Sequence, residues 1–253
     1  MTLRKRAHLM ATKATSSPVT GTGTTRQPFL LELYRSAIGK KYIMAITGIV
    51  WLGYVFAHMV GNLKIYLGAE SFNDYAYFLR TGLLVPIVPE EAALWGMRVL
   101  LVVTLAFHIL AAYQLTVMNR NARPERYQVR RDYVAADFAA RTMRWTGVIV
   151  LLFILFHIAD LTLGWVNPAA PGSTPFEKLV ASFEQPLVAA FYVIANLALG
   201  FHIYHGTWSL FQSMGWNNRR FTYWRKAFAI GFTVVVIGGN VSFPLAVVFG
   251  LVG

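Results

Sequence analysis

Five long apolar runs dominate this sequence, and each is long enough to cross a lipid bilayer. They cover roughly residues 41–67, 94–118, 144–166, 186–213 and 227–252. A membrane-spanning helix needs about 20 mostly apolar residues to cross a hydrocarbon layer of about 30 Å. The composition agrees, because only 13% of the residues are charged, against about 25% in soluble domains. The sequence therefore predicts an all-α membrane protein with five transmembrane helices.

The segment before the first run has a different composition. Residues 1–28 include the stretch ATKATSSPVTGTGTT, which lacks the apolar centre of a secretory signal. Such a Ser/Thr/Gly-rich segment buries too little apolar surface to fold alone. We expect a disordered, basic cytoplasmic tail over 1–28 and one membrane domain over 29–253. The piece PFLLELYRSAIGKK is amphipathic and is expected to lie at the membrane surface.

The basic residues predict the orientation of the chain. Lys and Arg concentrate in cytoplasmic segments close to the membrane. Of the 23 basic residues, 19 lie in the segment up to Lys41 or in the segments 120–144 and 219–226 that follow the second and fourth runs; the four others are Lys64, Arg80, Arg98 and Lys178. The N-terminus is therefore predicted to be cytoplasmic and the C-terminus external. The same placement argues that the net charge of +12 serves the membrane and not nucleic acid.

Each of the first four runs contains a histidine, and the fifth contains none. Ionisable side chains at membrane depth are costly and are usually functional. The first four histidines in the order of the runs are His58, His108, His157 and His202. We interpret them as axial ligands of two b-type haems held in a bundle of the first four helices, as helix bundles commonly hold cofactors. We recognise no internal repeat beyond this recurrence of one histidine per run.

Depth sorts these histidines into two pairs. At about 1.5 Å per residue, His58 and His157 lie at similar distances from the outer ends of their helices. His108 and His202 likewise lie at similar distances from the inner ends. An outer pair, His58 with His157, and an inner pair, His108 with His202, are therefore predicted. The depths within a pair match to within about 2 Å.

His205 stays ambiguous, because it follows His202 by three residues and shares its helical face. It could replace His202 as a ligand, bind a haem propionate or face a quinone. Asp160, three residues after His157, is either a carboxylate that supports the outer site or handles protons, or an interfacial residue. Further polar candidates for a quinone or propionate are Ser36, Lys40 and His205 on the inner side, and Asn62, Asp74 and Asp160 on the outer side.

The composition excludes several other redox centres. The chain has no cysteine, so it has no c-type haem attachment and no thiolate ligands for an iron–sulphur cluster. It also has no dinucleotide-binding fingerprint and no hydrophilic domain. A flavin site is therefore not expected in this chain.

Several motifs carry a resemblance to a known family. FAHMVGN, LAFHILAAY, LFHIAD and FHIYHGTWSLFQSMGW occur in this order over five spans, SAIGKKYIMAITG leads into the first, and AESFNDYAYFLRTG follows it. From about Ser36 onward the chain resembles the single-chain dihaem cytochrome b anchors of succinate dehydrogenases and fumarate reductases. In that family the first histidine of the pattern His202, Gly206, Trp208 is the haem ligand. The four ligands map onto His58, His108, His157 and His202, and residues 1–28 lie outside the match.

The resemblance implies the following functional expectations. The chain would be the quinone-reducing membrane part of an enzyme in a bacterial cytoplasmic membrane. A flavoprotein subunit would oxidise succinate, and an iron–sulphur subunit would pass the electrons to the inner haem. The outer haem and a quinone, expected to be menaquinone, would follow. The alternatives are an anchor for a different dihaem quinone oxidoreductase, including one that works in the fumarate-reducing direction, and more remotely a transporter with a histidine proton relay.

Overall fold

The structure, a computed structural model, describes residues 28–122, 136–216 and 218–253, and these residues form helices and no strand. Five helical segments are long and apolar enough to cross a membrane, which confirms the predicted fold class. They are α2 (Ala37–Asn62) with the 3-10 turn η1 (Leu63–Leu67), α4 (Ala92–Asn121), α5 (Ala136–His157) with the π-helical turn η2 (Ile158–Thr162), α7 (Pro186–Ser213) and α8 (Thr222–Val248). The predicted tail lies almost wholly outside the described residues.

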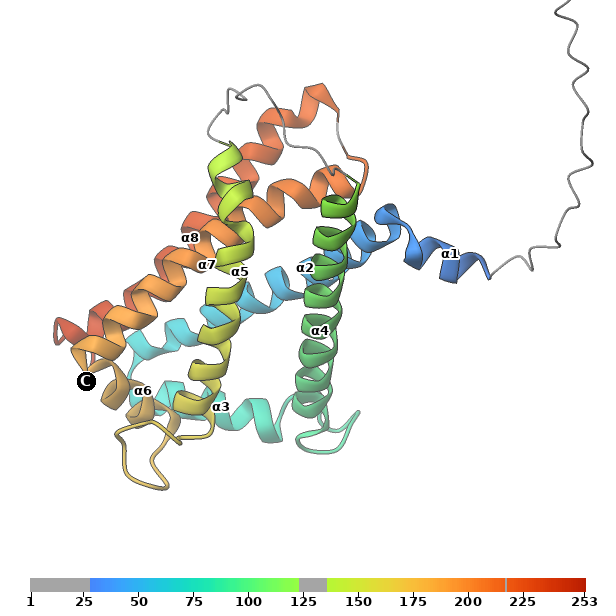
Figure 1. The fold of residues 1–253 in the computed structure, drawn as a ribbon. Helices are drawn as coiled ribbons and strands as arrows, with labels where there is room; N and C mark the ends of the chain where they lie inside the picture. Colours follow the sequence, from blue (N-terminus) through green and yellow to red (C-terminus); the bar gives the residue numbers. More distant parts are fainter. Residues whose placement is uncertain (1–27, 123–135, 217) are drawn as a thin grey trace, which may run out of the picture.

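Four shorter elements flank these helices: α1 (Phe29–Arg35), α3 (Ala69–Thr81), α6 (Pro175–Phe183) and the turn η3 (Arg219–Phe221). Helix α6 starts with a capping box, in which the Thr174 hydroxyl and the Glu177 carboxylate each bind the backbone N–H of the other residue. Helices α3 and α6 pack together at one end of the long helices, near the C-terminus (Figure 1).

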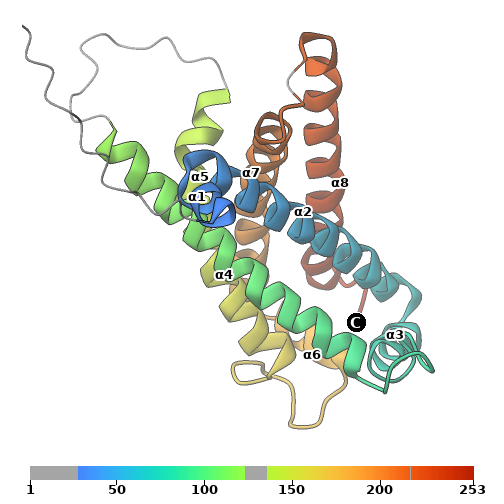
Figure 2. The same cartoon turned by 90° about the vertical axis from the view of Figure 1, so that its right-hand side faces the viewer.

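The long helices form two packed groups. Helix α2 packs along α4, while α5 packs along α7 and α7 packs along α8. More sparse contacts of α2 with α7 and α8 join the groups (Figures 1 and 2). The start of α2, the ends of α4 and α7 and the starts of α5 and α8 gather at one end of the bundle. This basic end is the one that the sequence predicts to be cytoplasmic, and it is called the inner end; the opposite end is called the outer end.

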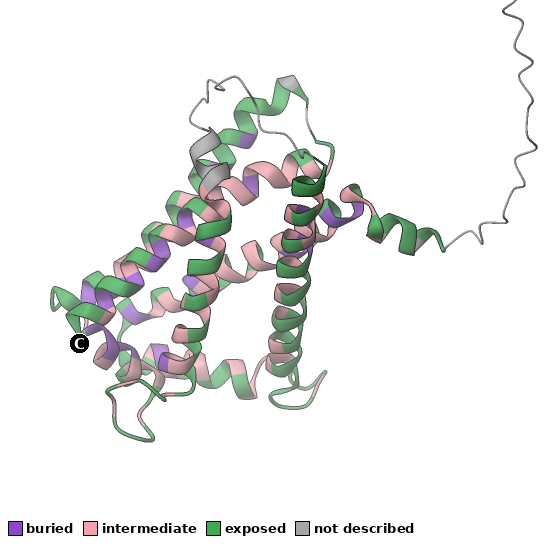
Figure 3. Ribbon diagram, viewed as in Figure 1, coloured by how far each residue is buried: buried purple, intermediate pink, exposed green. Residues whose placement is uncertain are grey.

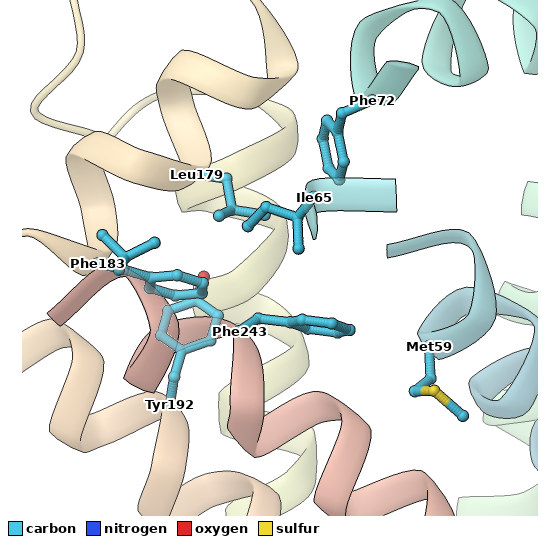
Figure 4. Packing of buried hydrophobic residues seen from close by; sticks show 8 residues of the cluster. Met59, Ile65, Phe72, Leu179, Phe183, Tyr192 and Phe243 are labelled. Atoms are coloured by element: carbon cyan, nitrogen blue, oxygen red, sulfur yellow. The ribbon is translucent and has the colours of Figure 1, made fainter. Parts of the chain in front are cut away.

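The apolar core is concentrated at the outer end. One cluster of buried side chains joins α2, η1, α3, α6, α7 and α8: Met59, Ile65, Phe72, Leu179, Phe183, Tyr192, Phe243 and Val247 (Figure 4). By contrast, most of the surface of α4 is exposed, and it is largely apolar (Figure 3). An exposed apolar surface of this length suits contact with lipid.

Helix boundaries differ from the predicted runs mainly at their inner ends. Helix α8 begins at Thr222 instead of residue 227, and the first span begins at Ala37 instead of residue 41. Charged residues occupy these extra turns. Since backbone hydrogen bonds form a helix whether or not its side chains are apolar, hydropathy alone locates only the part of each helix inside the hydrocarbon layer.

Candidate cofactor site

The structure brings four histidines together in two pairs, each made by one histidine from each helix group. The ring centroids of His58 and His157 are 5.8 Å apart, and those of His108 and His202 are 6.3 Å apart. An imidazole nitrogen binds a transition metal at about 2 Å, so two rings on opposite sides of one metal ion have centroids about 6 Å apart. Both separations fit a metal held between two axial imidazoles.

A cavity of about 480 Å³ lies at the inner pair, between α2, α4, α5 and α7. Its wall is mostly aliphatic and includes both rings of the pair. Polar side chains of Lys41, Ser209, Gln212 and Ser213 also line it. The indole N–H of Trp51, another lining residue, is buried and has no hydrogen-bond partner in the part of the chain that the structure describes. The cavity therefore suits a large, mostly apolar ligand that also carries acceptor groups.

Two threonines contact the inner histidines. Oγ1 of Thr47 lies 3.0 Å from Nδ1 of His108, and Oγ1 of Thr146 lies 3.5 Å from Nδ1 of His202. In each ring this contact leaves Nε2 as the nitrogen for a metal. Both threonines are buried.

The outer pair has different neighbours. The ring of Tyr54 stacks on His58 with 5.5 Å between centroids, and the amide Nδ2 of Asn62 lies 3.3 Å from Nε2 of His58. A metal bound at Nε2 would replace that hydrogen bond. Nδ1 of His157 is buried without a partner among the described residues. Asn62, a sequence candidate for the outer side, thus lies beside His58, and its role there stays a prediction.

Asp160 lies in the π-helical turn directly after His157 and is only 1% exposed. Its two carboxylate oxygens accept hydrogen bonds from Asn167 Nδ2 at 2.8 Å, from Ser182 Oγ at 2.6 and 2.7 Å, and from Tyr192 Oη at 2.8 Å. The Tyr192 ring in turn lies 5.9 Å from the His157 ring. Asp160 is thus a buried acceptor that ties η2, α6 and α7 together beside the outer pair.

Ser36 and Lys40, two candidates of the inner side, form hydrogen bonds with backbone groups. The Ser36 hydroxyl caps α2 by accepting from the backbone N–H of Gly39 at 2.9 Å. The buried Lys40 ammonium donates to the carbonyl oxygens of Tyr34 at 2.8 Å and Arg35 at 3.3 Å, at the end of α1. The adjacent Lys41, which sequence reasoning did not select, is the lysine that lines the inner cavity.

The remaining candidates lie apart from the two pairs. His205 is half-buried on α7 and is not among the residues that line the inner cavity. Asp74 is exposed on α3, in a groove that also includes Lys64, Glu70 and Tyr75. Within the described residues, no three His, Asp or Glu side chains group to hold a bare metal ion. The two-histidine sites therefore suit a metal that brings its other ligands with it.

Comparisons with known proteins point to one family. Residues 116–239 match the family model described as succinate dehydrogenase/fumarate reductase transmembrane subunit. The chain is also similar to the succinate dehydrogenase cytochrome b558 subunit of Bacillus subtilis (strain 168). The two are 23% identical over 176 residues, which cover 69% of this chain and 79% of that protein. No solved structure matches the chain.

Proposed function

Because the chain belongs to the family of succinate dehydrogenase and fumarate reductase transmembrane subunits, we propose that it carries electrons between an iron–sulphur subunit and a quinone through two b haems. The observation that supports this most is the pairing of four buried histidines at two levels, 5.8 and 6.3 Å between rings. A flavoprotein subunit would supply the electrons by oxidising succinate. The same anchor chemistry serves the fumarate-reducing direction.

His58 with His157 would hold the outer haem, and His108 with His202 the inner haem. Each haem would supply a one-electron carrier, and two histidine ligands would leave its iron no open position, which favours electron transfer over oxygen chemistry. The cavity wall would exclude water from the inner macrocycle. Lys41, together with Ser209, Gln212 and Ser213, would meet the haem propionates, since these are the cationic and hydrogen-bonding groups of that wall.

The partners and orientation follow from the charge distribution. The basic inner end would lie in the cytoplasm and contact anionic lipid and the iron–sulphur subunit. The outer haem, the one more distant from that subunit, would then deliver electrons to a quinone, for which we propose menaquinone. Asn62 lies closest to this role among the outer polar candidates, because its amide already contacts His58.

The spectrum of the purified complex tests this proposal. A dithionite-reduced minus oxidised spectrum is expected to show low-spin b-type α-bands, with two haems per copy of this chain. One haem per chain would contradict the two-site arrangement. A chain without haem in an intact complex would refute the electron-transfer function.

His205→Ala is expected to keep both haems, because His205 does not line the inner cavity. The measurement is haem content per polypeptide together with the reduced-minus-oxidised spectrum, compared with wild type. His202→Ala on the same helix is the matched control and is expected to lose the inner haem. Loss of a haem from His205→Ala alone would transfer the ligand role from His202 to His205.

A further inference from the structure

Two helices of the bundle share a motif that extends beyond their histidines. In α2, Thr47 and Gly48 precede His58, and in α5, Thr146 and Gly147 precede His157, with nine residues between glycine and histidine in both. The partner helices also match, because α4 has the sequence LAFHI around His108 and α7 has LGFHI around His202. The α2–α4 pair is thus repeated as α5–α7. The repeat therefore extends beyond the recurrence of one histidine per span.

The repeated Thr-Gly dipeptides make the same contact in both copies. Each threonine places its hydroxyl at Nδ1 of the inner histidine on the partner helix, at 3.0 Å for Thr47 and 3.5 Å for Thr146. Each glycine faces the same ring, since a Cβ would lie 3.9 Å from Cε1 of His108 at Gly48 and 3.4 Å from Cε1 of His202 at Gly147, both ordinary van der Waals distances. The nine-residue spacer then sets the outer level about 16 Å away along the helix.

The hydrogen bonds of the two hydroxyls define the direction of this contact. A threonine hydroxyl has one proton to donate. Thr47 donates its proton to the carbonyl of Ile43 at 2.7 Å, and Thr146 donates to the carbonyl of Met143 at 3.0 Å. With that proton engaged, each hydroxyl oxygen is left to accept a proton from Nδ1 of the histidine. Backbone carbonyls are further acceptors beside the rings, from Met44 at His108 and from Met143 at His202. This arrangement favours the tautomer with the proton on Nδ1 and the lone pair on Nε2.

We propose that Thr47 and Thr146 are positioning residues that fix the tautomer, orientation and basicity of the inner haem ligands. This inference rests on the proposed function. A hydrogen bond from the second ring nitrogen of a metal-bound histidine orients the ring and raises its basicity. The outer pair has a different support: an amide N–H points at Nε2 of His58, and Nδ1 of His157 has no partner in the described part of the chain. The two sites therefore differ in the hydrogen bonds that orient their histidine rings before a metal binds.

Redox titration of the purified complex with Thr47→Val and Thr146→Val tests this role. The inner haem is identified as the component that His108→Ala lacks. We expect both haems to remain in each valine variant and the midpoint potential of the inner haem alone to rise, since a less basic imidazole stabilises ferric iron less. If the preference of the ligands for ferric over ferrous iron falls tenfold, the midpoint potential rises by about 59 mV for a one-electron couple. Thr47→Ser and Thr146→Ser, which keep the hydroxyl, should titrate like wild type.

Thr116→Val is the matched control. The Thr116 hydroxyl donates to the carbonyl of Ala112 on its own helix at 2.8 Å, as Thr47 and Thr146 donate to theirs, and among the described residues it makes no hydrogen bond with a histidine. This variant should leave both potentials unchanged. The inference is overturned if both valine variants keep the wild-type midpoint potential, or if Thr116→Val shifts the potential equally. Loss of both haems that the serine variants do not restore would also overturn it. Selective loss of the inner haem that serine restores would support it. A wild-type complex without haem would refute the proposed function instead.

Discussion

Alanine at His58 or His157 is expected to remove the same haem, leaving one haem per chain with one α-band. Alanine at His108 or His202 is expected to remove the other. The reason is the geometry: each iron would need both rings of one pair, and the pairs lie on two levels about 16 Å apart along α2 and α5. A haem with one remaining axial histidine is no longer held between two helices. Haem content per polypeptide and the reduced-minus-oxidised spectrum of the purified complex measure the result.

The spectra of the four variants identify the pairs without reference to depth. His58→Ala and His157→Ala should share one residual spectrum, and His108→Ala and His202→Ala should share the complementary one. His205→Ala is the control for an alanine substitution of a histidine on α7. Equal loss of both haems from a single variant would argue against independent sites. Matching spectra from His58→Ala and His108→Ala would replace the proposed pairing with a different one.

The sequence predicted the five spans and the depth of each histidine because both depend on simple length scales. Hydropathy locates the hydrocarbon layer, and 1.5 Å per residue converts position into depth. The pairs His58–His157 and His108–His202 were predicted on that basis, and the structure brings the rings of each pair close together. Their role as ligands stays a prediction. Depth alone was sufficient because the two helices of each pair, α2 with α5 and α4 with α7, run in the same direction and carry their histidines on one level.

Contacts between helices were beyond this reasoning. Lys40 and Lys41 are adjacent in sequence but point about 100° apart on a helix, and only the packing shows that Lys40 binds the end of α1 while Lys41 lines the cavity. The role of Thr146 depends likewise on the position of α7 relative to α5. The repeated Thr-Gly dipeptide was present in the sequence, but its meaning appears only when both copies contact a histidine.

Asp160 shows a third limit. The sequence left open whether its carboxylate supports the outer site or is an interfacial residue. The π-helical turn after His157 changes the helical phase, so the face of Asp160 did not follow from a regular 3.6-residue period. With 1% exposure and four hydrogen bonds from three donors, it is a buried structural acceptor in this fold.

Asp160→Ala is therefore expected to destabilise the outer end of the bundle strongly. The substitution removes the acceptor of the Ser182 hydroxyl and of the Tyr192 hydroxyl, whereas the Asn167 amide keeps its bonds to the Lys178 carbonyl and to Ser182 Oγ. A buried polar group left unpaired costs about 1–3 kcal/mol, so the two hydroxyls together cost about 2 kcal/mol or more. For a chain of this size, a loss of about 2 kcal/mol lowers the melting temperature by about 4–8 °C. Thermal denaturation of the complex, followed through each haem band, measures this change.

The outer haem band should report the loss first. The Tyr192 hydroxyl donates to Asp160 at 2.8 Å, and the centroid of its ring lies 5.9 Å from that of His157. The threonines beside the inner rings lie about 16 Å from the outer pair along the helices. Asp74→Ala, an exposed carboxylate at the same end of the molecule, is the matched control and should melt like wild type. If Asp160→Ala has the same melting temperature as Asp74→Ala but slows quinone reduction, the carboxylate handles protons and does not stabilise the fold. If it melts early with the outer band lost first, the buried acceptor is part of what keeps His157 in place.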